Sequence, residues 1–360
     1  MRICRLTQAI WANRAGGVPR PGWCTWLVTY RCNARCGMCE SWQMTPGAEM
    51  DADEAYGAFR DLGALDVVRI TGGEPFLRDD LGEILRAVYL ASQPSVLHVT
   101  TNGSLPDRVA SLVKQLPFRR RLSFLVSLDG CAAEHDRNRG SGARFGLALE
   151  TVRRLVAARR LGVRVAVNHT VISPQAIADH EPLKNALRPL EVDVLPVVAY
   201  SESAIYALRL RGRRADHLLA SGYPLHPALS GADVGGFVAH VLACAGAIRD
   251  PAARLGKRYY LAGLLSRLRG EARPSPRPRC VALRSHLRLL PDGSVPVCQF
   301  NGETVGRFGA EAFDGLWYGA RSVAARAFVD ACPGCWAECE VIPSAIYTGD
   351  ILRGLSRLSR

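Results

Sequence analysis

The stretch Tyr30-Arg31-Cys32-Asn33-Ala34-Arg35-Cys36-Gly37-Met38-Cys39 sets three cysteines in the pattern C-x3-C-x2-C, directly after the short apolar run Trp26-Leu27-Val28. Iron–sulfur clusters are held by cysteine thiolates, usually four of them. Three thiolates on one tight loop can therefore bind three irons of a [4Fe-4S] cluster and leave the fourth iron open to a substrate or cofactor. A zinc loop is the alternative, although zinc loops usually pair C-x2-4-C with a second ligand pair further along the chain.

Length and composition indicate a globular metal-binding protein. The chain has 360 residues, of which 48% are hydrophobic, enough for one large α/β domain and a smaller one. No stretch approaches the roughly 20 uninterrupted apolar residues of a membrane span. The N-terminus, Met1-Arg2-Ile3-Cys4-Arg5, lacks the apolar core of a signal peptide, so we expect a cytoplasmic protein. Twelve cysteines in such a chain favour metal ligation over disulfides.

The formal net charge is +13, and nearly all of the positive charge comes from arginine. Runs such as Arg119-Arg120-Arg121 and Arg211-Gly212-Arg213-Arg214 could attract an anionic substrate or a nucleic acid. The sequence has no zinc-finger pattern or aromatic RNA-binding motif to accompany this charge. We therefore expect a solvated basic surface and no nucleic-acid partner, or a small substrate that carries a carboxylate or a phosphate.

Short β-rich runs alternate with amphipathic helical stretches between residues 24 and 200. The expected strands are 24–29, 66–70, 95–101, 122–128, 164–172 and 192–199. The expected helices are 52–62, 81–91, 106–116, 145–161 and 175–187. Such a series of six βα units predicts an α/β fold with a parallel sheet and helical crossovers. Six units are fewer than the eight of a closed barrel.

The remaining chain predicts helices, a linker and a hairpin. Residues 201–270 predict helices, and the proline-rich residues 270–278 predict a linker. Residues 286–300 alternate around Pro291-Asp292-Gly293, which predicts a β-hairpin that turns at Asp-Gly. We expect these units: an N-terminal extension (1–22), a core barrel (23–215), a helical connector and linker (216–279), a small hairpin-plus-helix domain (280–345) and a C-terminal tail (346–360).

A second motif, Thr71-Gly72-Gly73-Glu74-Pro75, follows the second expected strand. Two glycines allow a ligand to approach the backbone closely, and the carboxylate beside them can pair with an ammonium group. An ordinary strand-to-helix turn is the alternative, which the cysteine loop upstream disfavours.

Together, the cysteine loop and the Gly-Gly-Glu-Pro motif resemble those of the radical S-adenosylmethionine (radical SAM) superfamily. The resemblance covers residues 24 to about 200 and implies a partial (β/α)6 TIM-like barrel. It implies that Cys32, Cys36 and Cys39 hold a [4Fe-4S] cluster, and that the Gly72–Pro75 motif binds the amino group of SAM. Family members cleave SAM reductively to a 5′-deoxyadenosyl radical, which abstracts hydrogen from the substrate. The electron would come from a donor such as flavodoxin or ferredoxin.

Further residues match family positions near SAM. Met38 stands where an aromatic residue is common, and its thioether can still pack near adenine. The other matches lie at or beyond strand ends, at the rim where the ligands of such barrels bind. They are Thr101, Asn102, Ser127, Asp129, Arg139 for the carboxylate of SAM, Asn168 for the ribose and Leu195 for the adenine.

A second group of cysteines lies near the C-terminus, as Cys280-x17-Cys298 and then Cys332-x2-Cys335-x3-Cys339. It resembles the auxiliary-cluster modules known as SPASM and, in a shorter form, twitch. A full SPASM module uses seven cysteines for two clusters, so five predict one auxiliary [4Fe-4S] cluster, held by Cys280, Cys298 and two or three of the last three cysteines. Tetrahedral zinc is the alternative, because C-x2-C with two further cysteines also suits it.

The fate of the substrate radical decides whether the reaction is an epimerisation, a dehydrogenation or a decarboxylation. A thiol can donate hydrogen in an epimerisation, and Cys131 and Cys244 are the loose thiols. A structural cysteine is the ordinary alternative for each.

The resemblance also bears on the substrate. Twitch-type relatives often act on sugars, aminocyclitols or nucleosides in natural-product pathways such as antibiotic biosynthesis, whereas SPASM relatives often modify ribosomally made peptides. Only about twenty residues precede the first expected strand, too few for an added peptide-binding domain, so we expect a small sugar-like or nucleoside-like substrate. The alternatives are a peptide maturase with a separate leader-binding protein, and a non-catalytic metal- or nucleic-acid-binding protein.

Overall fold

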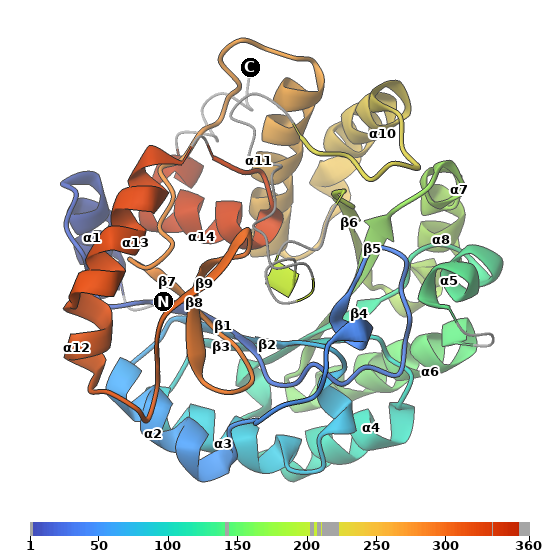
Figure 1. Ribbon diagram of the computed structural model, residues 1–360. Coiled ribbons are helices and arrows are strands. Elements are labelled where there is room, and N and C mark those ends of the chain that lie inside the picture. The colour runs from blue at the N-terminus through green and yellow to red at the C-terminus, as the bar shows by residue number, and fades with distance from the viewer. Residues whose placement is uncertain are drawn as a thin grey trace.

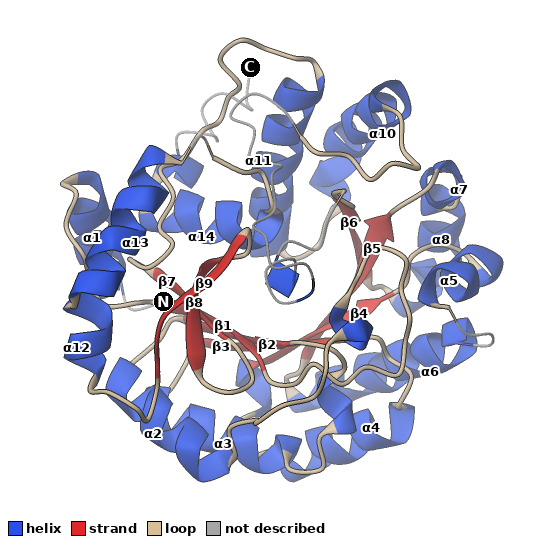
Figure 2. Cartoon of the chain, in the orientation of Figure 1, coloured by secondary structure: helices blue, strands red, loops and turns tan. Residues whose placement is uncertain are grey.

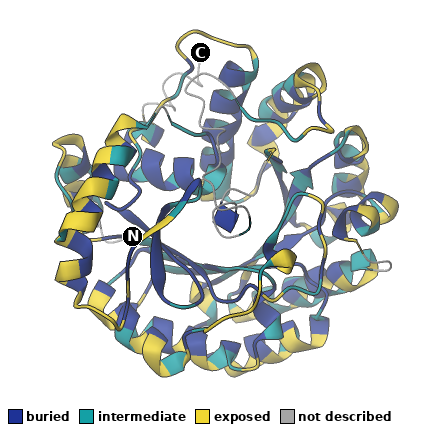
Figure 3. Ribbon diagram, viewed as in Figure 1, coloured by how far each residue is buried: buried dark blue, intermediate teal, exposed yellow. Residues whose placement is uncertain are grey.

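The structure is a computed structural model, which describes residues 3–140, 144–201, 205–206, 210, 223–332 and 334–352. In these residues, strands form an inner layer and helices surround it (Figures 1 and 2). The helix faces that meet the sheet are buried and the outward faces are largely exposed (Figure 3). No helix of the described residues is long and apolar enough to cross a membrane.

Six parallel strands follow one another in chain order: β1 (Trp23–Leu27), β2 (Val67–Thr71), β3 (Val96–Thr101), β4 (Leu122–Ser127), β5 (Arg164–Val171) and β6 (Asp193–Val198). The crossovers contain α2 (Ala52–Leu62), α3 (Leu81–Ser92), α4 (Pro106–Gln115), α5 (Ala132–Arg139), α6 (Arg144–Ala157), α7 (Pro174–Ala178) and α8 (His180–Leu187). The predicted partial (β/α)6 barrel is therefore confirmed. The helix expected at 175–187 is split into α7 and α8, since Pro182 lacks the N–H that a continuous helix would need there.

Local sequence explains why the crossover helices begin and end where they do. Asp51 caps α2 by accepting from the backbone N–H of Glu54, and the Glu54 side chain accepts from the Asp51 N–H in return. Gly63 ends the helix with a positive φ of 76°, a conformation that glycine adopts without strain. The face between these ends buries Phe59 and Leu62 in the main core.

The hairpin predicted over 286–300 is wrong, because residues 286–289 form strand β7 (His286–Leu289) of the barrel sheet. Strand β7 runs parallel to β1 and extends the barrel sheet, which has the order β6-β5-β4-β3-β2-β1-β7. Every residue of β7 is buried, as is typical of strands in a parallel sheet that is covered on both faces. The antiparallel hairpin forms later, between β8 (Ser294–Cys298) and β9 (Asn301–Arg307).

The C-terminal helices close the open side of the sheet, between the edge strands β6 and β7. Lys257 of α11 (Pro251–Leu268) donates to the Pro196 carbonyl of β6 at 3.0 Å and to the Glu338 carboxylate of α14 (Glu338–Tyr347) at 2.8 Å. The main core also reaches into the C-terminal region, where it includes Trp317 of α12. The other helices are α1 (Ile3–Arg14), α10 (Gly231–Cys244), α12 (Phe313–Tyr318) and α13 (Ala320–Ala331).

The structure tests only part of what was predicted for the segment between β6 and β7. Helices α10 and α11 lie within the stretch 201–270 that predicted helices, whereas the basic run 211–214 lies outside the described residues. The domain boundaries stay a prediction. Since β7 belongs to the barrel sheet, the core and the small C-terminal domain share one sheet.

Candidate active site

The cysteine loop 32–39 follows β1 at the carboxyl end of the sheet. The end of α5 holds it, because the backbone N–H of Arg35 donates to the Arg139 carbonyl at 2.9 Å and that of Gly37 to the Asn138 carbonyl at 3.1 Å. The last carbonyls of a helix have no partner inside it and are free for such contacts. The sequence analysis missed α5, which fixes the loop that carries the three thiols.

The three thiols are chemically suited to a [4Fe-4S] cluster. Burial raises the pKa of Cys32, Cys36 and Cys39, that of Cys39 to about 12, and the nearby Arg139 guanidinium partly offsets this. A bound metal supplies the positive charge that such thiols need to lose their protons. The backbone N–H of Ala34 also points to Cys32 Sγ at 3.5 Å, and N–H groups of this kind stabilise cluster sulfurs.

Gly72 and Gly73 press the end of β2 against the start of the cysteine loop. The Gly73 N–H donates to the Thr29 carbonyl at 2.7 Å, and the Glu74 N–H donates to the Arg31 carbonyl at 2.8 Å. Gly72 has a φ of 138°, and a Cβ there would overlap the Thr29 carbonyl. A Cβ at Gly73 would overlap the Arg31 backbone. The motif therefore fits two backbone segments together beside the thiols.

Glu74 is 1% exposed, and the end of β3 fixes its carboxylate. Oε1 accepts from the Thr101 hydroxyl at 2.8 Å and from the Phe76 N–H at 3.0 Å, while Oε2 accepts from the Asn102 N–H at 2.6 Å. Burial raises the pKa of Glu74, and these three hydrogen bonds lower it in part. Thr101 and Asn102 thus contact Glu74, and Asn102 also donates to Asn33 of the cysteine loop at 2.8 Å.

Asp129 and Arg139 form a buried ion pair beside the cysteine loop. Oδ2 of Asp129 accepts from Arg139 Nε and Nη2, each at 2.7 Å, and from Asn138 Nδ2 at 2.8 Å. Oδ1 accepts from the Thr170 N–H at 3.2 Å. The aspartate is fully buried, so in this structure it orients Arg139 and Asn138.

Three other residues of the sequence analysis lie on the inner face of the barrel. Ser127 and Asn168 are paired in register at the ends of β4 and β5, and Asn168 Nδ2 donates to Thr170 Oγ1 at 3.0 Å. Leu195 packs in a cluster with Ala245. Val197, two residues further along the same face of β6, lines the central cavity.

The central cavity has a volume of about 270 Å³ and lies between the two groups of cysteines. Met38 and Cys39 of the loop line it, and so does Cys339, in the first turn of α14. Arg69 of β2 and Arg288 of β7 also reach it. One thiol from each cysteine group therefore lines the same cavity.

The other four C-terminal cysteines line a separate cavity of about 290 Å³. They are Cys280, Cys298, Cys332 and Cys335. Backbone N–H groups point at two of these sulfurs, from Phe300 to Cys298 and from Gly334 to Cys332, each at 3.4 Å. Among the described residues, no three ligating side chains converge on a point that suits one metal ion.

The two loose thiols of the sequence analysis lie elsewhere. Cys131 precedes the first residue of α5, and its backbone N–H donates to Asp179 Oδ2 at 2.7 Å. Cys244 is exposed at the end of α10. Neither lines the central cavity described above. Sequence reasoning missed Arg69 and Arg288 there; the alternation of burial along β2 was a partial signal for Arg69, whereas β7 is buried throughout.

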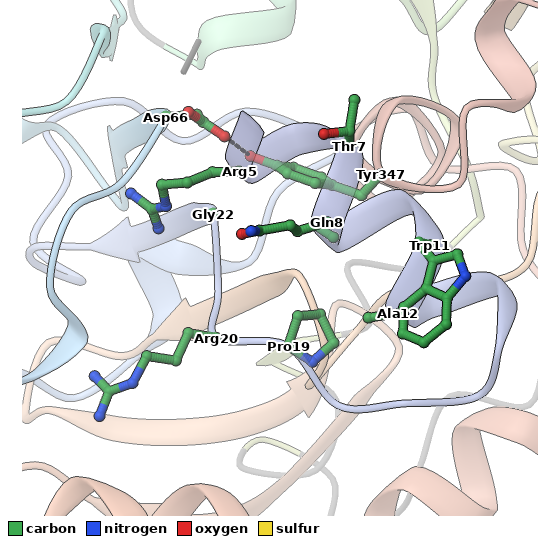
Figure 4. A pocket seen from close by; sticks show the side chains of 11 residues that line it. Arg5, Thr7, Gln8, Trp11, Ala12, Pro19, Arg20, Gly22, Asp66 and Tyr347 are labelled. Atoms are coloured by element: carbon green, nitrogen blue, oxygen red, sulfur yellow. Dashed lines mark hydrogen bonds between the residues drawn. The ribbon is translucent and has the colours of Figure 1, made fainter. Parts of the chain in front are cut away.

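A third cavity lies at the opposite end of the barrel and has a volume of about 600 Å³ (Figure 4). Helix α1 supplies Arg5 and Trp11 to it, and Tyr347 donates to Asp66 Oδ2 at 2.8 Å across its wall. It sits where β1 and β2 begin, away from both cysteine groups. Ligands of such barrels bind at the carboxyl ends of the strands, so we assign this cavity no part in the reaction.

Comparisons with known proteins agree with this site. Residues 26–185 match the family model of the radical SAM superfamily. Over 157 residues the chain is 31% identical to GTP 3′,8-cyclase of Aquifex aeolicus, covering 40% of this chain and 46% of that protein. It is also 31% identical over 157 residues to the mycofactocin maturase of Mycobacterium tuberculosis, covering 42% and 38%. The chain spans less than half the length of these curated relatives.

The fold is similar over nearly the whole chain to that of anSMEcpe, a protein solved with bound AdoMet. The TM-score is 0.61 at 14% sequence identity, and the match covers 95% of this chain and 98% of that chain. The common fold therefore includes the C-terminal region as well as the barrel. Residues 26–185 therefore carry a radical SAM domain, of a family whose cofactors are a [4Fe-4S] cluster and SAM, and the C-terminal region continues the fold that the chain shares with anSMEcpe.

Proposed function

We propose that this enzyme removes a hydrogen atom from a small sugar-like or nucleoside-like intermediate of a natural-product pathway, in an epimerisation, a dehydrogenation or a decarboxylation. The observation that carries the proposal is the central cavity, which Cys39 and Cys339 both line. Its volume of about 270 Å³ is slightly below the roughly 300–1,000 Å³ of small-molecule pockets, which favours a small substrate. The similarity to GTP 3′,8-cyclase, whose named substrate is a nucleotide, supports a nucleoside-like molecule.

When bound, the core cluster and SAM supply a 5′-deoxyadenosyl radical, while the protein supplies position and keeps water out. Cys32, Cys36 and Cys39 are the proposed ligands of the core cluster. Gly72 and Gly73 pack the end of β2 against the start of the cysteine loop, and the Gly72–Pro75 motif is the proposed site for the amino group of SAM. Arg139, oriented by Asp129, is the proposed partner of the carboxylate of SAM.

The auxiliary cluster is proposed to use Cys280, Cys298, Cys332 and Cys335, because these four thiols line one cavity. Cys339 lines the central cavity instead, so in this proposal it binds no iron and faces the substrate. Cys339 then replaces Cys131 and Cys244 as the thiol best situated to meet a substrate radical. A flavodoxin or ferredoxin remains the proposed electron donor, and the cytoplasm the proposed compartment.

The test is anaerobic reconstitution of the full chain with iron and sulfide, followed by a count of iron and of 5′-deoxyadenosine released under dithionite. We expect about eight irons per chain, from two four-iron clusters. Candidate sugars and nucleosides labelled with deuterium then reveal the substrate, because the label moves into 5′-deoxyadenosine. A count of about four irons per chain would show that the C-terminal cysteines bind no iron–sulfur cluster, and the auxiliary cluster would be rejected. Iron-replete protein that releases no 5′-deoxyadenosine with any candidate would count against the activity.

A peptide maturase is the second candidate, favoured by the similarity to the mycofactocin maturase. A maturase would need a peptide substrate, and its turnover would depend on a separate leader-binding protein. Transfer of deuterium from a small molecule alone, without any peptide, would exclude this candidate.

A further inference from the structure

The central cavity is positively charged among the residues that the structure describes. Its charged lining residues are Arg69 and Arg288, and no described carboxylate lines it. The rest of the described lining is apolar, hydroxyl-bearing or thiol-bearing, apart from Gln299. A ligand that enters this space therefore meets two guanidinium groups.

Arg69 carries an unbalanced charge. It stands in β2, in register with Thr25 of β1 and His98 of β3, on the inner face of the barrel. Its Nε is buried and has no hydrogen-bond partner. No carboxylate among the described residues forms an ion pair with it, in contrast to Lys257, which pairs with Glu338 at 2.8 Å.

Arg288 is 4% exposed and lines the same cavity. Its Nε donates to Glu340 Oε1 at 2.8 Å, but its Nη2 is buried without a partner. Glu340 also accepts from the Gln299 N–H at 3.0 Å and lies 3.0 Å from His286 Nδ1. The carboxylate is therefore already engaged by several groups and does not satisfy Nη2.

Among the described side chains in and next to the cavity, Arg69 is left without an ion-pair partner. Lys257 with Glu338 and Arg288 with Glu340 form two neutral pairs. Burial lowers the pKa of His98 to about 3 and also lowers that of His286, so both rings are neutral. A buried charge without a partner is costly. An anion in the cavity beside Arg69 and Arg288 would balance this charge.

We propose that Arg69 and Arg288 form an anion-binding subsite that holds a carboxylate or phosphate group of the substrate between the two cysteine groups. Guanidinium groups suit both anions, since their N–H groups match two oxygens at once. The inference rests on the proposed function, because it narrows the substrate to sugar-like or nucleoside-like molecules that carry an acidic group.

The test measures equilibrium binding of inorganic phosphate to the reconstituted full chain at fixed ionic strength, by calorimetry under anaerobic conditions. Acetate serves as the carboxylate probe and glycerol as the neutral one. Arg69→Gln removes the unpaired charge, and Arg288→Lys keeps a cation beside Glu340 while it removes Nη2. We expect each variant to bind phosphate or acetate about tenfold more weakly, the effect of one lost charge-assisted hydrogen bond. Tighter binding of phosphate than of acetate would identify a phosphate group in the substrate, and the reverse a carboxylate.

Arg60→Gln on the outer surface of α2 is the matched control, since its side chain is 68% exposed and it changes the net charge equally. An equal loss of binding in Arg60→Gln would overturn the subsite, because the effect would come from overall charge. The absence of saturable anion binding in the wild type would overturn it too. A third contrary result is unchanged anion binding in Arg69→Gln with an altered spectrum of the auxiliary cluster, since the guanidinium would then serve the cluster.

The same samples separate this inference from the proposed function. Release of 5′-deoxyadenosine without anion binding would reject the subsite alone. Anion binding that depends on Arg69 in iron-replete protein that cannot cleave SAM would retain the subsite and reject the radical reaction.

Discussion

Arg139 donates from Nε to Oδ2 of Asp129 over 2.7 Å, and both side chains are buried. The backbone carbonyl of the same Arg139 accepts from Arg35 in the cysteine loop. Arg139 therefore connects the Asp129 carboxylate, after β4, to the loop that carries the three core thiols. Loss of the Asp129–Arg139 ion pair should therefore lower both the stability of the protein and the iron content of the core cluster.

Asp129→Asn removes the partner of a buried arginine while it keeps the side-chain volume. An uncompensated buried charge costs about 3–5 kcal/mol, so we expect this loss in denaturant unfolding and a lower iron content of the core cluster. Asp107→Asn is the control, since Asp107 pairs with Arg154 but is 90% exposed. That variant should stay within about 0.5 kcal/mol of the wild type. An Asp129→Asn protein with wild-type stability would contradict the importance of the pair.

Single cysteine variants test which thiols hold the auxiliary cluster. Cys335→Ala should lower the reconstituted iron from about eight to about four per chain, because one ligand of four is lost. Cys339→Ala should keep about eight, since its thiol lines the other cavity. Cys335 directly precedes Trp336 and Cys339 lies three residues after it, so the two variants alter the same short segment. Iron loss in Cys339→Ala with full iron in Cys335→Ala would reverse the assignment.

Gly263 of α11 allows the ring of Trp336 to pack against the helix. A Cβ at Gly263 would overlap that ring, which also donates from Nε1 to the Tyr260 carbonyl at 2.8 Å. We expect Gly263→Ala to cost about 1–3 kcal/mol through overpacking and to lower the auxiliary iron, because Trp336 follows Cys335 directly. Thermal unfolding and iron analysis measure both effects.

Gly256→Ala in the same helix is the matched control for that prediction. The nearest atom to a Cβ there is Ile342 Cδ1 at 3.6 Å, an ordinary contact. This variant should gain up to about 1 kcal/mol from helix propensity and keep its iron. Equal behaviour of the two alanine variants would show that the Trp336 contact does not matter.

His98 predicts how stability depends on pH. Burial, with Arg69 and Arg164 as lesser causes, lowers its pKa to about 3, whereas the unfolded chain takes up this proton below about pH 6.5. The contribution of neutral His98 to the free energy of unfolding is therefore complete above pH 6.5 and falls as the pH drops towards 3. Between pH 7.5 and pH 5 this one group should cost about 2 kcal/mol, and His98→Asn should flatten that part of the curve. An unchanged slope in His98→Asn, relative to the exposed His240→Asn, would contradict the prediction.

The sequence allowed most of the barrel and the two cysteine groups to be predicted, because both depend on local patterns. Strands β2 to β6 follow apolar runs, and α2 carries its own capping box. The pairing of β7 with β1 was not predictable in this way, since Thr25 and His286 meet across 261 residues of sequence. A local Asp-Gly signal therefore led to the wrong hairpin.

In the candidate site, too, the features that depend on local sequence were predictable, and those that depend on distant contacts were not. The cysteine loop and Gly72-Gly73-Glu74-Pro75 were recognisable because spacing alone identifies them. Cys339 lines a different cavity from the other four C-terminal thiols because of where α14 begins its first turn, which spacing does not reveal. Arg69 likewise resembles any arginine in a strand until its neighbours are known to lack a carboxylate.

The seventh strand has a consequence for how the protein is made. On a ribosome, β1 emerges early, but the chain that covers its outer edge emerges only with β7. Until then the nascent barrel presents a row of unpaired backbone groups, and such an edge invites pairing with other chains. A gene cut after residue 279 should therefore yield an aggregating product, whereas circularly permuted genes that place β7 ahead of β1 should shorten the vulnerable interval.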